Sequence, residues 1–190
     1  MCSSDLVSYT RSPGLCASGR FLNVGAPLCS RGVSETPTDG CGKSPGLTHV
    51  DGAGRARMVD VSGKPASIRI ARAGCTVRLT ADLRALIWAG KLPKGDALVV
   101  ARIAGIQAAK ETSRLIPLCH PLPLSHVQVE FAEDGADGLR ITAEARTEGP
   151  TGVEMEAMSA AAVAALTIYD MVKALHRGTA IERLELEHKS

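Results

Sequence analysis

Three short clusters of residues in this sequence have the types and spacing that chemistry needs. The first is the loop at 115–124, where three prolines within seven residues form a stiff turn around Cys119 and His120. A histidine held there is suited to act as a general acid, a hydrogen-bond donor or a phosphate contact. The alternative is a structural role, in which the histidine ring only hydrogen-bonds to the backbone of a tight turn. No second cysteine or histidine lies at ligand spacing, so we expect no metal site and interpret Cys119 as a small core residue.

The second cluster is the acidic pair Glu154 and Glu156, at the start of a long helix predicted to run to about residue 176. A capping box at Thr151 and Glu154 is expected to begin this helix, and Gly178 to close it. Acids in a first turn are explained by the helix dipole alone. The helix is otherwise nearly uncharged, however, and an acid kept on so apolar a helix usually has a partner or a task.

The third cluster, Asp170 and Lys173, lies one turn apart near the end of the same helix. Such pairs are often surface ion pairs that contribute little to stability. Here the pair follows an apolar segment that is predicted to be buried. Burial would withdraw both groups from water, shift both pKa values and leave a proton donor beside a proton acceptor.

Cations suited to an anionic substrate are spread over predicted loops and element ends. A flexible lysine before an apolar run, as at Lys94, is able to reach a phosphate. Each of these residues alone is equally explained as a solvated surface charge. The candidates are Lys64, Arg69, Arg72, Lys94 and Lys110.

The hydrophobic periodicity predicts the elements that must position these clusters. From residue 97 the predicted order is β-α-β-β-α-β, the ferredoxin-like arrangement, which gives an α+β fold with an antiparallel sheet and two helices on one face. Upstream of it we expect a strand at 75–79 and a helix from an N-cap at Thr80 to Gly90. The other predicted elements are a buried strand at 97–101, a helix at 103–116, a hairpin with strands around 127–131 and 139–145, the long helix, and a strand at 181–186.

Composition divides the 190 residues into two parts. Residues 1–46 are rich in Ser, Gly, Pro and Cys and are expected to be disordered or non-native, while 47–190 form the domain. A net charge of +2 and 3% aromatic residues argue against nucleic-acid binding. No apolar run is long enough to span a membrane. We expect free thiols and a cytoplasmic location, or a mitochondrial one if 1–46 act as a transit segment.

Five strings, in order along the domain, closely resemble one known family: the molybdenum cofactor biosynthesis protein C (MoaC) family, the cyclic pyranopterin monophosphate synthases. The resemblance extends over residues 47–190. Family members usually continue beyond residue 190 with a tail containing two glycines, so we expect a truncated C-terminus. The strings are 58–62 (MVDVS), 104–110 (AGIQAAK), 115–121 (LIPLCHP), 151–157 (TGVEMEA) and 164–171 (AALTIYDM).

The resemblance implies a lyase. It would convert 3',8-cyclo-7,8-dihydroguanosine 5'-triphosphate, made by a radical S-adenosylmethionine partner enzyme, to cyclic pyranopterin monophosphate with release of pyrophosphate. No protein-bound cofactor is implied, although Mg²⁺ is expected with the triphosphate. Family members form homohexamers, trimers of dimers, with sites at the dimer interfaces. The alternative from another class is a non-catalytic oligomeric module that binds a nucleotide or pterin phosphate.

The resemblance also assigns roles to individual residues. Asp170 and Lys173 match the family's catalytic aspartate and its neighbouring lysine, and Lys94 matches a cation near the triphosphate that is suited to act as an acid. Asp170, Lys173, His120 and Glu156 are expected to converge in one pocket between two subunits. The substrate contacts that it implies are Leu118, Cys119, His120, Glu154, Met155 and Glu156, with Arg69 and Lys64 as further cations.

Overall fold

A four-stranded antiparallel sheet organises the part of the chain that the computed structural model describes, residues 53–190. The expected segment 1–46 and its boundary with the domain lie outside the described residues. Free thiols are found at Cys75 and Cys119. The elements in chain order are β1 (Ser67–Arg78), α1 (Ala81–Trp88), α2 (Ala97–Leu115), β2 (Leu124–Asp134), β3 (Gly138–Gly149), α3 (Glu154–Val172) and β4 (Ala180–Lys189).

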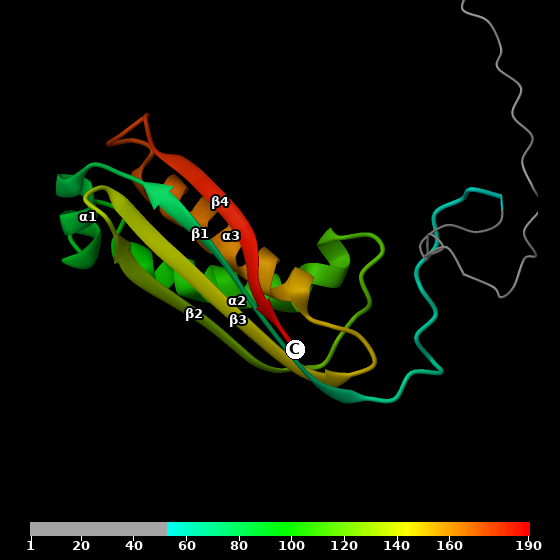
Figure 1. Ribbon diagram of the computed structural model, residues 1–190. Coiled ribbons are helices and arrows are strands. Elements are labelled where there is room, and N and C mark those ends of the chain that lie inside the picture. Colours follow the sequence, from blue (N-terminus) through cyan, green and yellow to red (C-terminus); the bar gives the residue numbers. More distant parts are fainter. Residues whose placement is uncertain (1–52) are drawn as a thin grey trace, which may run out of the picture. The chain divides into compact units, whose positions relative to one another are not determined.

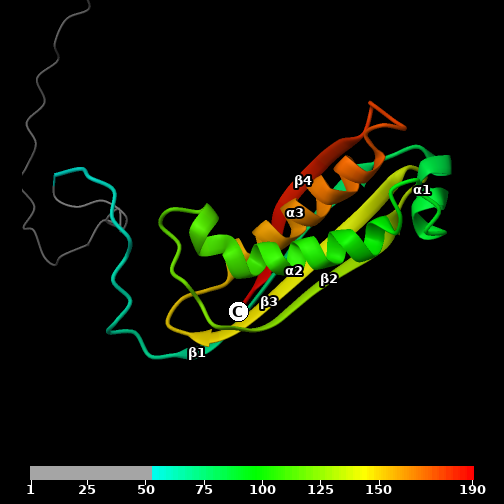
Figure 2. The same ribbon diagram turned by 180° about the vertical axis from the view of Figure 1, so that it is seen from behind.

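The sheet has the strand order β2-β3-β1-β4, and each neighbouring pair is antiparallel. Helices α2 and α3 lie side by side across one face of this sheet, as Figures 1 and 2 show from opposite sides. Apart from the short helix α1, the order is β-α-β-β-α-β. The predicted α+β, ferredoxin-like fold and the predicted β2–β3 hairpin are therefore confirmed.

The predicted strand at 97–101 is wrong, because these residues form the first turns of α2. The Asp96 side chain caps the helix, with Oδ1 accepting hydrogen bonds from the backbone N–H groups of Leu98 and Val99 at 3.0 Å each. A short apolar run fits a buried strand and a buried helix equally well. The first strand of the βαββαβ order is instead β1, which extends eight residues upstream of the predicted start at 75.

Local capping predictions succeed for α1 and fail for α3. Thr80 caps α1 through a hydrogen bond from Leu83 N at 3.3 Å, and Gly90 follows the helix with a positive φ of 64°. In contrast, α3 has Val153 at its N-cap without a side-chain hydrogen bond, so the capping box at Thr151 does not form. The helix ends at Val172, before Gly178.

Small side chains allow α3 to lie close to the sheet. Along one side of it Ala157, Ala160, Ala161, Ala164 and Ala165 are fully buried. The core faces of β1 and β3 are also small over part of their length, at Ala71 and Ala73 of β1 and at Ala143 and Ala145 of β3. By length and composition α3 would also suit a membrane span, but half of that apolar window is buried inside the domain, as in a core helix.

The crossing of α2 and α3 depends on Gly105. A Cβ added there would lie 2.8 Å from the backbone oxygen of Ala160 and 3.0 Å from Cγ2 of Val129. We therefore expect Gly105→Val to lower the free energy of unfolding by about 2–3 kcal/mol, since the helices must separate. Chemical denaturation at equilibrium measures this loss.

The matched control is Gln107→Val, which places the same side chain at an exposed position of the same helix. It should change the free energy of unfolding by no more than about 0.5 kcal/mol. Equal effects of the two substitutions would show that α2 and α3 do not require this close approach.

Candidate functional site

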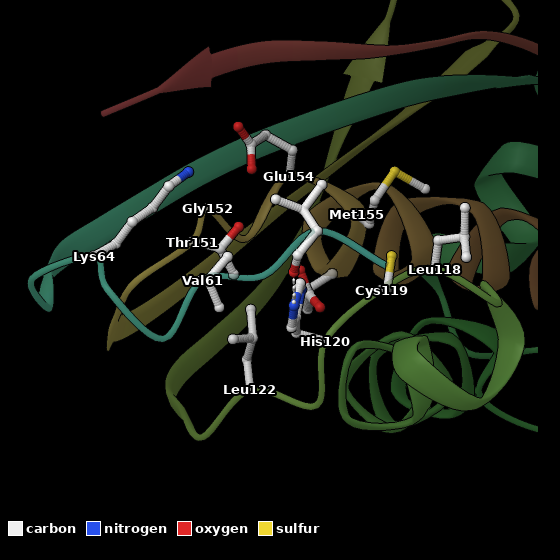
Figure 3. A pocket seen from close by; sticks show the side chains of 12 residues that line it. Val61, Lys64, Leu118, Cys119, His120, Leu122, Thr151, Gly152, Glu154 and Met155 are labelled. Atoms are coloured by element: carbon white, nitrogen blue, oxygen red, sulfur yellow. Dashed lines mark hydrogen bonds between the residues drawn. The ribbon is translucent and has the colours of Figure 1, made fainter. Parts of the chain in front are cut away.

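A cavity of about 320 Å³ lies where the first turn of α3 meets the 115–124 loop and the segment before β1 (Figure 3). We call it pocket 1. Seven of the residues singled out in the sequence line it, although they come from three separate segments. These seven are Lys64, Leu118, Cys119, His120, Glu154, Met155 and Glu156.

The loop that carries His120 is fixed at both ends. Cys119 N donates to Ile116 O at 3.1 Å, directly after α2. At the other end, the buried hydroxyl of Thr147 on β3 donates to Pro123 O at 2.7 Å. The His120 ring pairs through Nε2 with the backbone oxygen of Val59 at 2.8 Å. The ring therefore makes the hydrogen bond to backbone that was one of its two expected roles, and it also lines the pocket.

Burial raises the pKa values of two groups in the inner wall of the pocket, the Glu156 carboxyl and the Cys119 thiol. Glu156 is 4% exposed, and desolvation raises the pKa of its carboxyl above the ordinary value. Desolvation, and then the nearby charge of Glu156, raises the pKa of the Cys119 thiol. Cys119 is half-buried in the pocket wall rather than in the core, so the expectation of a core residue is wrong.

A second, smaller cavity adjoins pocket 1 and shares Gly152 and Glu154 with it. Arg69 reaches it because side chains alternate along β1, which puts Arg69 on the core face just beyond the end of the core. Its Nε is buried and has no hydrogen-bond partner among the described residues. Lys189 of β4 lines the same cavity and lies 3.4 Å from Glu154 Oε1.

Lys189 was not among the residues selected from the sequence. It reaches the site because β4 pairs with β1 in a register that places Lys189 opposite Ala71, two residues from Arg69. The strand was predicted to end near residue 186, and register cannot be predicted from local pattern alone. Long-range strand pairing is the signal that would have identified it.

The third predicted cluster forms at the other end of α3. Lys173 Nζ lies 2.6 Å from Asp170 Oδ1, and Lys94 Nζ donates to Asp170 Oδ2 at 2.9 Å and to the backbone oxygen of Asp170 at 2.7 Å. Hydrogen bonds from Lys173 and then Lys94 lower the pKa of Asp170 to about 2. The same contact raises the pKa of Lys173.

The expectation that Asp170 and Lys173 are withdrawn from water is wrong for the single chain. Their side chains are 55% and 56% exposed, because they lie on the outer face of α3, whereas Met171 and Val172 of the same turn are buried. The pKa shifts therefore come from ion pairing and hydrogen bonding rather than from desolvation. They keep Asp170 ionised at neutral pH.

The two groups of site residues are separated along α3. Asp170 is fourteen positions beyond Glu156 on the helix, which at 1.5 Å per residue corresponds to about 21 Å. The expected convergence of His120 and Glu156 with Asp170 is therefore not found within one chain. The other two cations expected from the sequence line neither of these cavities. Arg72 pairs with Glu144 at 2.8 Å on the face of the sheet that no helix covers, and Lys110 lines a separate hollow beside β2.

A comparison with known protein families bears directly on this geometry. The family model described as "MoaC family" matches residues 58–190. The match covers more than half of the chain. It includes every residue that lines pocket 1 and the three residues Lys94, Asp170 and Lys173.

The ion-pair cluster leads to a prediction about titration. In Lys173→Ala the pKa of Asp170 should rise from about 2 toward its ordinary value of 3.8, because the first of its two lysine partners is gone. The folded-state value lies below the unfolded one, so the interaction stabilises the fold above the unfolded pKa and is lost as the pH falls toward 2. Carboxyl carbon chemical shifts followed by NMR measure the midpoint.

Lys91→Ala serves as the control, because it removes an exposed lysine that is not among the groups shifting the pKa of Asp170. The Asp170 midpoint should stay near 2 in that variant. An identical midpoint in both variants would mean that net charge, rather than the Lys173 contact, holds the pKa down.

Proposed function

The chain belongs to the MoaC family, which makes cyclic pyranopterin monophosphate in molybdenum cofactor biosynthesis, and from this premise we propose how its own residues carry out the reaction. The proposed substrate is 3',8-cyclo-7,8-dihydroguanosine 5'-triphosphate, supplied by a radical S-adenosylmethionine enzyme, with Mg²⁺ on its phosphates. The observation that carries the proposal is that three segments far apart in the sequence bring seven of the expected site residues together around pocket 1.

The reaction includes ring rearrangement and one phosphoryl step. In that step a hydroxyl of the ribose-derived part attacks the α-phosphorus and forms a new P–O bond. The bond to the β-phosphate breaks, pyrophosphate leaves with the electron pair, and the hydroxyl proton passes to a base. The protein must therefore hold a guanine-derived ring, accept protons and stabilise a polyphosphate as it departs.

Pocket 1 suits the ring end of such a substrate. Leu118 and Met155 supply apolar surface, and the carboxyl groups of Glu154 and Glu156 suit the N–H donors of a guanine-derived ring. Burial raises the pKa of Glu156, which makes this carboxylate a stronger base than an exposed one.

The adjoining cavity suits the phosphates. Arg69 offers a buried Nε–H without a partner among residues 53–190, and Lys189 and Lys64 stand on either side of the wall formed by Glu154. A guanidinium and two ammonium groups suit the pairing of a triphosphate or a departing pyrophosphate. An anion here would compete with Glu154 for Lys189.

The Asp170 cluster would move protons. At neutral pH the lowered pKa keeps Asp170 as a carboxylate, and Lys173 and Lys94 donate hydrogen bonds to it. The contact fixes both groups in place but makes Lys173 a weaker acid and Asp170 a weaker base than usual, so proton transfer would require the substrate to displace one of the ion-pair partners. Asp170, Lys173 and Lys94 are accordingly proposed as the catalytic residues.

A complete site would need two copies of the chain, because pocket 1 and the Asp170 cluster lie at opposite ends of α3. Large apolar side chains exposed on the outer surface of the helices support such an interface, among them Val99, Ile103 and Leu166. We propose a dimer in which pocket 1 of one subunit receives the Asp170 cluster of the other. Three such dimers would form the homohexamer.

Turnover of the cyclic triphosphate tests the chemistry. The purified chain should release pyrophosphate and form cyclic pyranopterin monophosphate, and Asp170→Asn should lower kcat by at least about 100-fold, since it removes the proposed base. Product formation is followed by chromatography and pyrophosphate by a coupled assay. Binding of the triphosphate without release by the wild-type chain would favour the non-catalytic module instead.

A mixing experiment tests the two-copy site. Asp170→Asn is combined with a second variant, Glu154→Gln/Glu156→Gln, in which both pocket acids are neutral. If each site takes pocket and proton cluster from different chains, half of the randomly mixed dimers are mixed and each has one intact site, so about one quarter of the wild-type activity should return.

The control omits subunit exchange: the same two variants are mixed without a cycle of dissociation and reassociation. Their activity should remain that of the separate proteins. Failure to regain activity after exchange, with mixed dimers shown by native mass spectrometry, would place each complete site within one chain.

A further inference from the structure

We propose that His120 is a positioning residue: through its hydrogen bond to the backbone of Val59 it holds residues 59–64, here called the strap, along the mouth of pocket 1. The inference rests on the proposed function, because it concerns how that pocket is kept ready for its substrate. It concerns the backbone of the strap rather than contact between His120 and the substrate.

The strap has little structure of its own to fix it. It contains neither helix nor strand, and apart from Val59 and Val61 its residues are exposed. Its internal contacts form a compact turn, with Lys64 N donating to Val61 O at 3.0 Å and Ser62 N donating to Asp60 Oδ1 at 3.0 Å. These bonds shape the strap but do not attach it to the domain.

Attachment comes from the opposite wall of the pocket. Among the hydrogen bonds found within residues 53–190, the one that joins the strap to the rest of the domain runs from His120 Nε2 to Val59 O, at 2.8 Å. The histidine end is rigid, because Pro121 follows His120 and the Thr147 hydroxyl secures Pro123. A stiff loop thus holds a strap that has no helix or strand of its own.

The geometry of this bond fixes the ring's protonation. A carbonyl oxygen accepts hydrogen bonds and cannot donate them, so Nε2 of His120 must carry the hydrogen. This nitrogen is therefore not free to act as a general base while the strap is in place. A side-chain amide is able to make the same donation, so glutamine is the conservative replacement.

The strap presents two groups to the substrate. Val61 supplies apolar wall and Lys64 supplies a cation, and both line pocket 1 (Figure 3). The strap also leads within three residues to β1, the strand that carries Arg69. Release of the Val59 carbonyl would free Lys64 while leaving the Asp170 cluster untouched, so substrate binding should suffer more than the chemical step.

Hydrogen exchange of the full-length chain, read by mass spectrometry without substrate, tests the attachment. In His120→Ala the two hydrogen-bonded amides of the strap, those of Ser62 and Lys64, should exchange about tenfold faster than in the wild type, whereas in His120→Gln they should stay within about threefold. His126→Ala, which removes an exposed imidazole on β2, should leave the strap unchanged. Amides of β3 report on folding in every variant.

Kinetics give the second readout. His120→Ala should raise KM for the cyclic triphosphate about tenfold with kcat within about twofold, and His120→Gln should restore KM. Unchanged strap exchange in His120→Ala would overturn the proposal. So would a His120→Gln variant that keeps the strap protected but loses kcat, because the ring's chemistry would then be essential. If the wild type lacks turnover, the proposed function fails and the exchange data still decide the role of His120.

Discussion

Close packing of α3 on the sheet is the constraint on which the rest of the structure depends. A row of buried alanines on α3 faces alanines of β1 and β3, and at the crossing with α2 the backbone oxygen of Ala160 leaves no room for a Cβ at position 105. Because these small side chains are closely packed, the helix has little freedom to shift. The two ends of α3 are thereby fixed, and both groups of site residues are held at those ends.

The helix also sorts the charges of the site. Glu154 and Glu156 occupy the first turn, where the partial charge of the backbone is positive, and two lysines lie next to the other end, Lys173 as the C-cap residue and Lys94 from outside the helix. Lys94 shows how a cation binds at this end of the helix, because it contacts both the Asp170 carboxylate and the backbone oxygen of Asp170 in the last turn. One apolar helix therefore separates the acids of pocket 1 from the two lysines that pair with Asp170.

Local signals in the sequence were sufficient where one segment determines the outcome. The Thr80 cap, the β2–β3 hairpin and the stiff loop around His120 all depend on neighbours within a few residues. Prediction failed where distant segments decide. The exposure of Asp170 depends on what covers the end of α3, and the place of Lys189 depends on strand register. The apolar run at 97–101 is a different case, because the local cap at Asp96 makes it a helix.

The sulfur in pocket 1 has a chemical consequence of its own. Desolvation and the adjacent Glu156 raise the pKa of Cys119, so at neutral pH less of it is thiolate than in an ordinary exposed cysteine. Thiolate is the form that attacks electrophiles and is readily oxidised. The soft, polarisable sulfur that lines the cavity is thus more fully in its neutral thiol form than an exposed cysteine would be.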